Sequence, residues 1–328
     1  MKIVLITPEG PTSRTGNRVA ATRWARILRR LGHRVRVASD YDGKPADLMV
    51  AVHAWRSAAS IERFKATFPD RPVVLQLSGT DIYQFIETDP VPTLRSMELA
   101  DRLVALNERA WRAVPKRLRA RLVVIHQSAA PLPWPRRPSR SAVVVSVIGH
   151  LRDVKDPMRA AEAARLLPAE SRVRIEQVGR AYTPQWAARA RAEMAVNPRY
   201  IWRDDVPAAA VRRLLALSHA MVISSLSEGG ANVVSEAIVA GVPVLASKID
   251  GNVGLLGADY SGYFPVGDTA ALARLLRRLE HEPRFVAQLG RALAGRAPLF
   301  HPAREMVAWR RLLSGLGCRT SETKRRSP

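Results

Sequence analysis

Residues 220–247 read AMVISSLSEGGANVVSEAIVAGVPVLAS, and this stretch decides the class of fold. The apolar run 220–224 has the length and composition of a buried parallel strand. Residues 231–240 are expected to follow as a helix, and 242–246 as a second buried strand. A strand, a helix and a further strand in this order predict one crossover unit of a parallel sheet.

The same alternation runs along the whole chain. We expect strands at 2–7, 35–37, 48–52, 73–77, 103–106 and 122–125, and a helix at 17–31. After residue 139 we expect strands at 142–148, 172–178, 199–202, 220–224 and 242–246, and helices at 157–167, 184–194, 207–217 and 231–240. This alternation predicts an α/β fold with helices on both faces of each parallel sheet.

A proline-rich stretch divides the chain. Residues 130–139 contain four prolines and are the best candidate for a linker. We therefore predict two doubly wound, Rossmann-like domains, 1–135 and 136–316, with a ligand-binding cleft between them. The last helix, about 302–316, is able to pack back on the N-terminal domain, and the basic tail 317–328 is expected to be disordered.

The composition favours a globular enzyme of the cytoplasm. Hydrophobic residues make up 47% of the 328 residues, which excludes global disorder. No apolar run approaches the ~20 residues of a membrane-spanning helix, and MKIVLITPEG at the N-terminus is typical of a first strand rather than a signal peptide. Cys318 is the single cysteine, and no two histidines have metal-ligand spacing on one helix. We therefore expect neither a disulfide, nor a bound metal, nor another cofactor.

The net charge needs a separate explanation. Lys and Arg number 52 against 29 Asp and Glu, which gives +23, and only seven are Lys, so that 52 − 7 = 45 are Arg. An Arg-rich background explains much of this excess, whereas the specific alternatives are nucleic acid, a membrane surface or an anionic small substrate. Aromatic residues make up 6%, and no recognition motif or basic–aromatic stripe is visible, so we expect no nucleic-acid partner.

Two glutamates flank the start of the helix at 231–240. Glu228 lies in the loop after the strand 220–224, and Glu236 lies within the helix. The backbone between them begins with Gly229, Gly230, Ala231 and Asn232. Glycine lets the backbone approach a ligand closely, and the N–H groups at a helix start suit phosphate. A loop carboxylate and a helix carboxylate would thus bracket a nucleotide sugar.

Further loops after predicted strands carry cations. Strand 142–148 is followed by Gly149, His150, Arg152 and Lys155, and strand 2–7 by Arg14, Thr15, Gly16, Asn17 and Arg18. Guanidinium groups and helix-start amides both suit phosphate oxygens, so we expect these loops to bind phosphate groups. Thr80 and Asp81 follow strand 73–77 and are also expected to face the cleft.

The stretch from Glu228 to Ser247 resembles the donor-site motif of GT-B glycosyltransferase family 4, whose members use nucleoside-diphosphate sugars. The resemblance covers the chain up to about residue 316. It implies that Glu228 contacts the donor sugar and Glu236 the ribose, with 229–232 lining the sugar and diphosphate.

The family pattern is matched in part by the other loops. Lys155 stands at the family's diphosphate-binding lysine, whereas His150 replaces its usual arginine, which Arg152 could supply. Ser78 stands where many members carry a histidine that contacts the donor sugar near the reacting carbon. The loop with Arg14 and Arg18 is implied to contact the acceptor or the donor phosphate.

The detailed pattern is most similar to the selenosugar synthases of bacterial selenoneine biosynthesis. The similar stretches are 13–19, 23–28, 78–81, 149–152, 228–236 and 251–256. This resemblance implies that a UDP-sugar, chiefly UDP-N-acetylglucosamine, reacts with selenophosphate to form a carbon–selenium bond. A selenium anion needs no general base, which agrees with Ser78, and an anionic acceptor agrees with Arg14 and Arg18.

The alternative is a family 4 glycosyltransferase that acts on a lipid or a cell-surface glycan. The basic amphipathic helix 17–31, which contains Trp24, would then lie on anionic lipid. We favour the selenosugar reaction, in which no membrane contact is needed.

Overall fold

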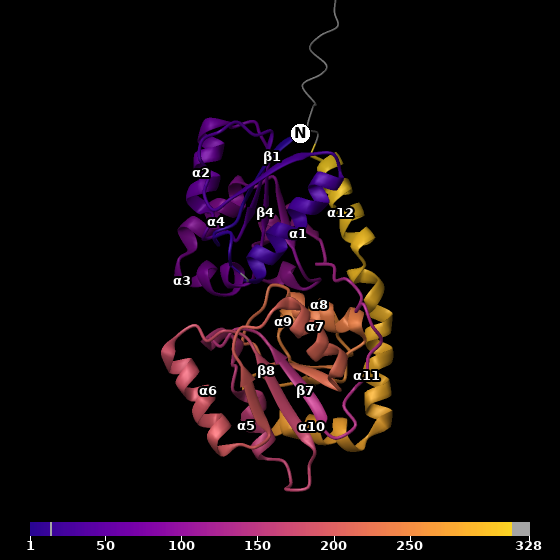
Figure 1. The fold of residues 1–328 in the computed structure, drawn as a ribbon. Helices are drawn as coiled ribbons and strands as arrows, with labels where there is room; N and C mark the ends of the chain where they lie inside the picture. The colour runs from indigo at the N-terminus through magenta and orange to yellow at the C-terminus, as the bar shows by residue number, and fades with distance from the viewer. Residues whose placement is uncertain (14, 317–328) are drawn as a thin grey trace, which may run out of the picture. The chain divides into compact units, whose positions relative to one another are not determined.

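The computed structural model describes residues 1–13 and 15–316 (Figure 1). Arg14, one of the expected phosphate-binding residues, lies outside the described residues, as does the tail 317–328. The described residues divide into two compact units. The first unit comprises Met1–Gln127 and the described residues from Pro302 onward, and the second comprises Ser128–His301.

The first unit is built on a parallel sheet of six strands in the order β2-β1-β3-β4-β5-β6. The strands are β1 (Lys2–Ile6), β2 (Arg34–Ala38), β3 (Leu48–Val52), β4 (Val73–Gln76), β5 (Arg102–Ala105) and β6 (Leu122–Val124). The helices are α1 (Gly16–Arg30), α2 (Ala58–Thr67), α3 (Ile86–Thr88), α4 (Pro90–Leu99) and α12 (Pro302–Ser314), with the helical turns η1 (Asp81–Phe85), η2 (Ala110–Arg112) and η3 (Lys116–Arg121). Strand β1 pairs in parallel with both β2 and β3, as the doubly wound prediction requires.

Alternate residues of these strands pack on opposite faces of the sheet. On β1, Val4 and Ile6 pack in one hydrophobic cluster, whereas Ile3 and Leu5 pack in another that also holds residues of α1 and α12. All five residues of β3 are buried. A parallel strand that is covered on both faces is apolar at every position, which explains the unbroken sequence LMVAV.

Helix α12 packs against α1 within the first unit (Figure 1). The rings of Trp24 and Trp309 meet edge to face, with centroids 4.7 Å apart and an interplanar angle of 70°. Trp24 Nε1 donates a hydrogen bond to Glu305 Oε1 at 2.7 Å, and Arg23 Nε lies 3.1 Å from both oxygens of that carboxylate. The last helix is therefore part of the core of the first unit.

This packing contradicts the idea that helix 17–31 lies on a membrane. Trp24 is 0% exposed, and the apolar face of α1 is buried in the unit. Apolar side chains that already fill a protein core are not available for insertion into lipid. Among the described helices, none has the length and apolar character needed to cross a membrane.

The second unit holds a second parallel sheet, in the order β12-β11-β10-β7-β8-β9. The strands are β7 (Val143–Ile148), β8 (Val173–Val178), β9 (Tyr200–Arg203), β10 (Ala220–Ile223), β11 (Val244–Ser247) and β12 (Tyr263–Phe264). The helices are α5 (Arg159–Arg165), α6 (Pro184–Val196), α7 (Ala208–Leu217), α8 (Asn232–Ala240), α9 (Asp250–Leu256), α10 (Thr269–His281) and α11 (Pro283–Arg296), with the turns η4 (Asp153–Lys155) and η5 (Ala297–Phe300). The predicted crossover of 220–247 is present as β10, α8 and β11.

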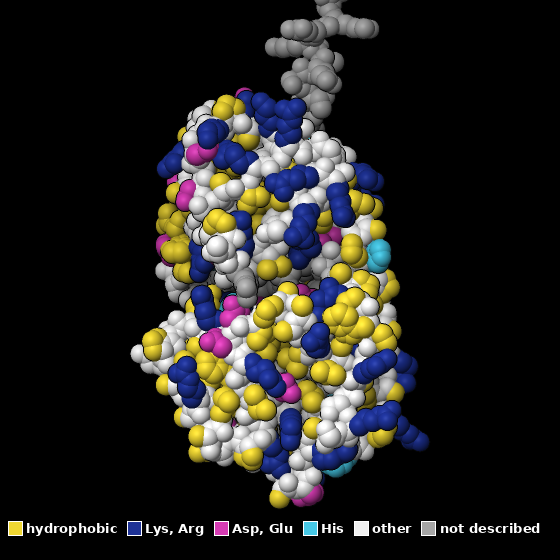
Figure 2. All heavy atoms as spheres, viewed as in Figure 1, with side chains coloured by type: hydrophobic (Ala, Val, Ile, Leu, Met, Phe, Trp, Pro, Cys, Tyr) yellow, Lys and Arg dark blue, Asp and Glu magenta, His cyan; other side chains and the backbone are white. Residues whose placement is uncertain are grey.

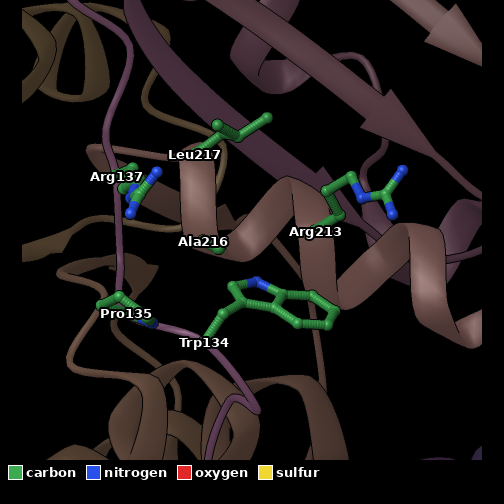
Figure 3. A pocket seen from close by; sticks show the side chains of 6 residues that line it. All are labelled: Trp134, Pro135, Arg137, Arg213, Ala216 and Leu217. Atoms are coloured by element: carbon green, nitrogen blue, oxygen red, sulfur yellow. The ribbon is translucent and has the colours of Figure 1, made fainter.

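The proline-rich segment 130–139 runs along α7 in the second unit (Figure 3). Its backbone N–H groups at Arg137 and Ser139 donate to the carbonyls of Ala216 and Leu217, at 2.9 and 3.2 Å. A pocket of about 370 Å³ lies here, lined by Trp134, Pro135, Arg137, Arg213, Ala216 and Leu217. Figure 3 shows the two guanidinium groups at opposite ends of this pocket, so they do not converge on one anion.

The packing of α12 gives a first prediction. Trp309→Ala removes a fully buried indole and should lower the free energy of unfolding of the first unit by about 3–5 kcal/mol. Val307→Ala, on the same helix but 46% exposed, is the control and should change little. Urea unfolding followed by circular dichroism, with amide hydrogen exchange of α1, measures both. Equal unfolding midpoints for the two variants would show that the Trp24–Trp309 contact is not part of the core.

Candidate functional site

The strand order of the second unit brings two predicted loops together. β10 pairs in parallel with β7, so the loops that follow these strands leave from the same edge of the sheet. One loop begins at Gly149 and contains η4, and the other begins at Ser224 and leads into α8. The backbone N–H of Leu226 donates to the carbonyl of Val154 at 2.9 Å, which ties the two loops to each other.

Lys155 and Glu228 meet across these loops. The Lys155 ammonium forms an ion pair with Glu228 Oε1, and their side chains are 23% and 10% exposed. Ser225 Oγ donates to the same oxygen at 2.6 Å. The structure thus brings together the carboxylate expected to contact the donor sugar and the lysine expected to bind the diphosphate, and the two charges neutralise each other.

The turn that carries Lys155 has a left-handed residue at its end. Asp156 has φ of +43°, which is uncommon for a residue other than glycine. The Ser224 hydroxyl lies 2.8 Å from the carbonyl oxygen of Asp156 and 3.1 Å from that of Lys155. Ser224 therefore holds this turn against the end of β10. Sequence analysis did not single out either serine, although both stand directly between the strand and the glutamate motif.

Helix α9 supports Glu228 from a third segment. A Cβ atom at Gly251 would lie 2.0 Å from the Glu228 carbonyl oxygen, far inside contact distance. Only glycine lets α9 approach this loop so closely. A similar approach occurs at Gly179, where a Cβ would lie 2.1 Å from the carbonyl oxygen of Gly149.

His150 and Arg152 lie around Tyr182 rather than on the ion pair. The His150 ring is 5.5 Å from the Tyr182 ring, and the Arg152 guanidinium lies 5.5 Å from the same ring. His150 Nδ1 accepts a hydrogen bond from the backbone N–H of Arg180 at 3.2 Å. This contact assigns the proton of the neutral ring to Nε2, which can donate to an anion.

The surroundings of His150 keep it neutral. Burial lowers the pKa of its imidazole, and the cations of Arg180, Arg152 and Lys155 lower it further. Asp205 opposes this shift of the pKa without reversing it. His150 can therefore act as an uncharged hydrogen-bond donor on the same loop as Arg152 and Lys155.

The other predicted donor residues lie at the start of α8. Ala231 is the N-cap and has extended backbone angles, Asn232 begins the helix, and Gly229 and Gly230 precede it. Glu236 lies on the second turn and is half-buried. These residues keep the positions that the sequence predicts for them, and their contacts with a ligand stay a prediction.

In the first unit, Glu9 organises the loop after β1. Its carboxylate accepts hydrogen bonds from Thr7 Oγ1 at 3.1 Å, and from Asn17 Nδ2 and Arg56 Nη1 at 3.2 Å. Thr15 is the N-cap of α1 and Gly16 its first residue, with Arg18 half-buried in the first turn. Four of the five residues predicted here for phosphate binding are described, and they all lie at this helix start.

Asp81 has a role that the sequence did not indicate. It is 0% exposed, and its carboxylate accepts hydrogen bonds from the backbone N–H groups of Ala54, Ser78, Gly79 and Ile82 at 2.7–3.0 Å. A carboxylate that binds four amides holds the loops after β3 and β4 together. Asp81 is therefore better explained as the residue that shapes this loop than as a ligand of the acceptor.

His53 lies in the same cluster, directly after β3. It has φ of +75° and is 1% exposed, and its Nε2 lies 2.9 Å from the hydroxyl of Thr80. Its Nδ1 accepts from the backbone N–H of Arg56 at 3.3 Å, so the neutral ring donates from Nε2 to Thr80. Burial lowers the pKa of His53, opposed by Asp81 at 4.0 Å.

The lowered pKa of His53 makes stability depend on pH. Below its ordinary pKa of 6.5, the unfolded chain takes up a proton that the buried imidazole resists, so acid favours unfolding. His53→Asn, which tolerates the left-handed backbone, removes this titration. We expect the melting temperature of the wild type to fall more steeply than that of the variant below about pH 6.5. Parallel curves from pH 8 to pH 5 would contradict this, since the other histidines are common to both proteins.

No group of three or more His, Cys, Asp or Glu side chains suited to a metal ion occurs among the described residues. A catalytic metal therefore has no candidate ligand cluster in this part of the chain.

A family model matches part of the chain. The family model for glycosyl transferases group 1 matches residues 135–294, which lie within the second unit. A search of curated proteins gave no significant match.

Solved structures share the fold over 96–97% of this chain. Anabaena Alr3699/HepE in complex with UDP-glucose is 16% identical with a TM-score of 0.74, covering 96% of this chain and 100% of that chain. Sucrose-phosphate synthase from Thermosynechococcus elongatus is 16% identical with a TM-score of 0.77, covering 97% and 100%. A glycosyltransferase from Rickettsia africae ESF-5 is 12% identical with a TM-score of 0.75, covering 97% and 99%. The chain therefore has the α/β fold of the GT-B glycosyltransferases, and its second unit carries the match to group 1.

Proposed function

We propose that the protein transfers a sugar from a UDP-sugar, chiefly UDP-N-acetylglucosamine, to selenophosphate. The selenium atom attacks the anomeric carbon, and the bond from that carbon to the UDP oxygen breaks as the carbon–selenium bond forms. Water then cleaves the phosphorus–selenium bond. The products are a selenosugar, UDP and phosphate.

The contact between Lys155 and Glu228 carries the donor half of this proposal. A cation and a carboxylate at adjacent strand ends suit a diphosphate and sugar hydroxyls, respectively. Arg152 and the neutral His150 add donors on the same loop, and the start of α8 adds amides. The Anabaena HepE structures contain UDP and UDP-glucose, which supports a UDP-sugar as the donor here.

The catalytic work in this proposal is electrostatic. As the donor bond breaks, negative charge grows on the diphosphate, and fixed cations stabilise it most when they need no rearrangement. Lys155 and Arg152 supply that charge, while Glu228 accepts hydroxyl hydrogens and orients the sugar. Glu236 is proposed to bind the ribose.

The acceptor half rests on the first unit. We propose that selenophosphate is held by Thr15, Gly16, Asn17 and Arg18 at the start of α1, by Thr80 after β4, and by Arg14. Selenophosphate is an anion that needs no proton removed, so the absence of the family's histidine at Ser78 is compatible with it. Asn17 lies against Glu9, so part of this loop is preorganised.

Two alternatives, a lipid acceptor and nucleic-acid binding, are less well supported. A lipid acceptor was suggested by the basic helix with Trp24, and that side chain is buried in the first unit. Figure 2 shows Lys and Arg side chains scattered over the visible face rather than gathered in one continuous patch. Nucleic acid binding needs a basic stripe or patch, which this face does not display.

The reaction itself is the test. Purified protein incubated with UDP-N-acetylglucosamine and selenophosphate should give a selenium-containing sugar by mass spectrometry, with UDP released in equal amount. Glu228→Gln should lower the rate by about 100-fold or more, because the sugar loses its charged acceptor. Glu282→Gln, an exposed residue at the start of α11, should keep full activity.

Two results would overturn parts of this proposal. Transfer from the UDP-sugar to a glycan or lipid, with none to selenophosphate, would keep the donor assignment and reject the acceptor. A protein that binds neither UDP nor a UDP-sugar would reject both.

The close approach at Gly251 gives a second test. Gly251→Ala places a methyl group against the Glu228 carbonyl, so the loop must shift and transfer should fall at least about tenfold. Gly290→Ala, in α11, puts the same methyl group in open space and should leave the rate unchanged. Equal activity of the two variants would show that the position of Glu228 does not depend on α9.

A further inference from the structure

Two adjacent serines directly follow strand β10 (Ala220–Ile223), and their hydroxyl groups contact different loops. Ser224 and Ser225 are 3% and 1% exposed. Ser224 reaches the turn that carries Lys155, whereas Ser225 reaches the Glu228 carboxylate.

A hydrogen bond fixes the backbone of Ser225 to β11. Its carbonyl oxygen accepts a hydrogen bond from Ser247 Oγ at 2.6 Å. The amide of Asn252 donates to the Ser247 carbonyl at 2.9 Å and lies 3.2 Å from its hydroxyl. Ser247 and Asn252 are both 0% exposed. A buried chain of small polar side chains therefore fixes Ser225 to β11 and α9.

Ser225 also determines how Glu228 presents its carboxylate. The Ser225 hydroxyl and the Lys155 ammonium both contact Oε1, and neither contact uses Oε2. A carboxylate bound through one oxygen has its plane and its second oxygen oriented. This arrangement suits an acceptor of sugar hydroxyls, which needs one well-placed oxygen.

Ser224 acts on the other half of the site. Its hydroxyl lies within hydrogen-bond distance of the carbonyls of Lys155 and Asp156, where the backbone enters the left-handed region. A non-glycine residue in this region persists when its surroundings hold it there. Ser224 thus supports the backbone from which the Lys155 side chain extends.

We propose that Ser224 and Ser225 are positioning residues, each of which serves the binding of a different part of the donor. Ser225 orients Glu228 for the sugar, and Ser224 fixes the turn that presents Lys155 to the diphosphate. The inference rests on the proposed donor site, and it does not depend on the identity of the acceptor.

Binding measurements with UDP and with UDP-N-acetylglucosamine separate the two roles. Ser225→Ala should keep the Kd for UDP within about twofold and weaken the Kd for the UDP-sugar about tenfold, since a hydrogen bond to a charged group is lost. Ser224→Ala should weaken both ligands by a similar factor of about five to ten, because both contain the diphosphate. Ser218→Ala is the matched control: it is a fully buried serine whose hydroxyl bonds Leu214 within α7, and it should change neither affinity.

A double variant tests whether Ser225 acts through Glu228. In a Glu228→Gln background, Ser225→Ala should cause no further loss of UDP-sugar affinity, because the carboxylate it orients is gone. Ser225→Thr keeps the hydroxyl and should recover part of the preference for the UDP-sugar over UDP. The melting temperature of each variant, taken in the same samples, reports folding independently of binding.

The outcomes are distinguishable. Equal losses of UDP and UDP-sugar affinity in Ser225→Ala, or additive losses in the double variant, would overturn the inference and indicate general structural support. If the wild type binds neither ligand, the proposed function fails, and the division of the donor fails with it. If the expected pattern appears but selenophosphate is not used, the inference stands and only the acceptor is rejected.

Discussion

The ion pair of Lys155 and Glu228 is the contact on which the arrangement of the second unit's site depends. Both side chains are largely removed from water, so each charge needs a partner close by. Breaking such a pair by removing one partner leaves the other charge poorly solvated. The ion pair thus gives each of these two partly buried charges a partner.

The pair can form because of the topology of a parallel sheet. β10 lies between β7 and β11, so segments that are far apart in sequence end at the same edge. The loop after β7 supplies Lys155, the loop after β10 supplies Glu228, and α9 after β11 supplies Gly251, whose missing side chain allows the approach. Each strand is largely apolar and buried, which fixes its register and with it the position of the loop that follows.

The sequence predicted the parts of this site that have local signals. Lys155 lies in a loop that begins with Gly149 after an apolar run, and Glu228 follows another apolar run and directly precedes two glycines, a pattern that indicates a strand end near a ligand. The sequence did not indicate a role for Ser224 and Ser225, because a serine after a strand is common. The hydrogen-bond partner of such a serine is known only when the fold places another loop beside it. Trp24 led to a wrong expectation for the same reason. An aromatic residue on a basic helix is compatible with membrane binding, but α12, some 280 residues later in the sequence, covers this side chain. Asp81 looked like a ligand residue, but the amides that surround it come from two separate loops.

The large positive charge also acquires a structural explanation. Arg136 donates to the carbonyls of Ser218 and Gly241, directly after the ends of α7 and α8, and Arg296 donates to those of Gly254 and Leu255 near the end of α9. Carbonyl groups at helix ends lack partners within the helix and carry partial negative charge, so cations there are stabilising. A guanidinium with several donors can satisfy two carbonyls at once, which lysine does with less geometric control. Part of the arginine excess therefore stabilises the ends of helices in the second unit. The cations at the strand ends, Lys155 and Arg152, are therefore only a small part of the excess, and the net charge alone does not indicate their role.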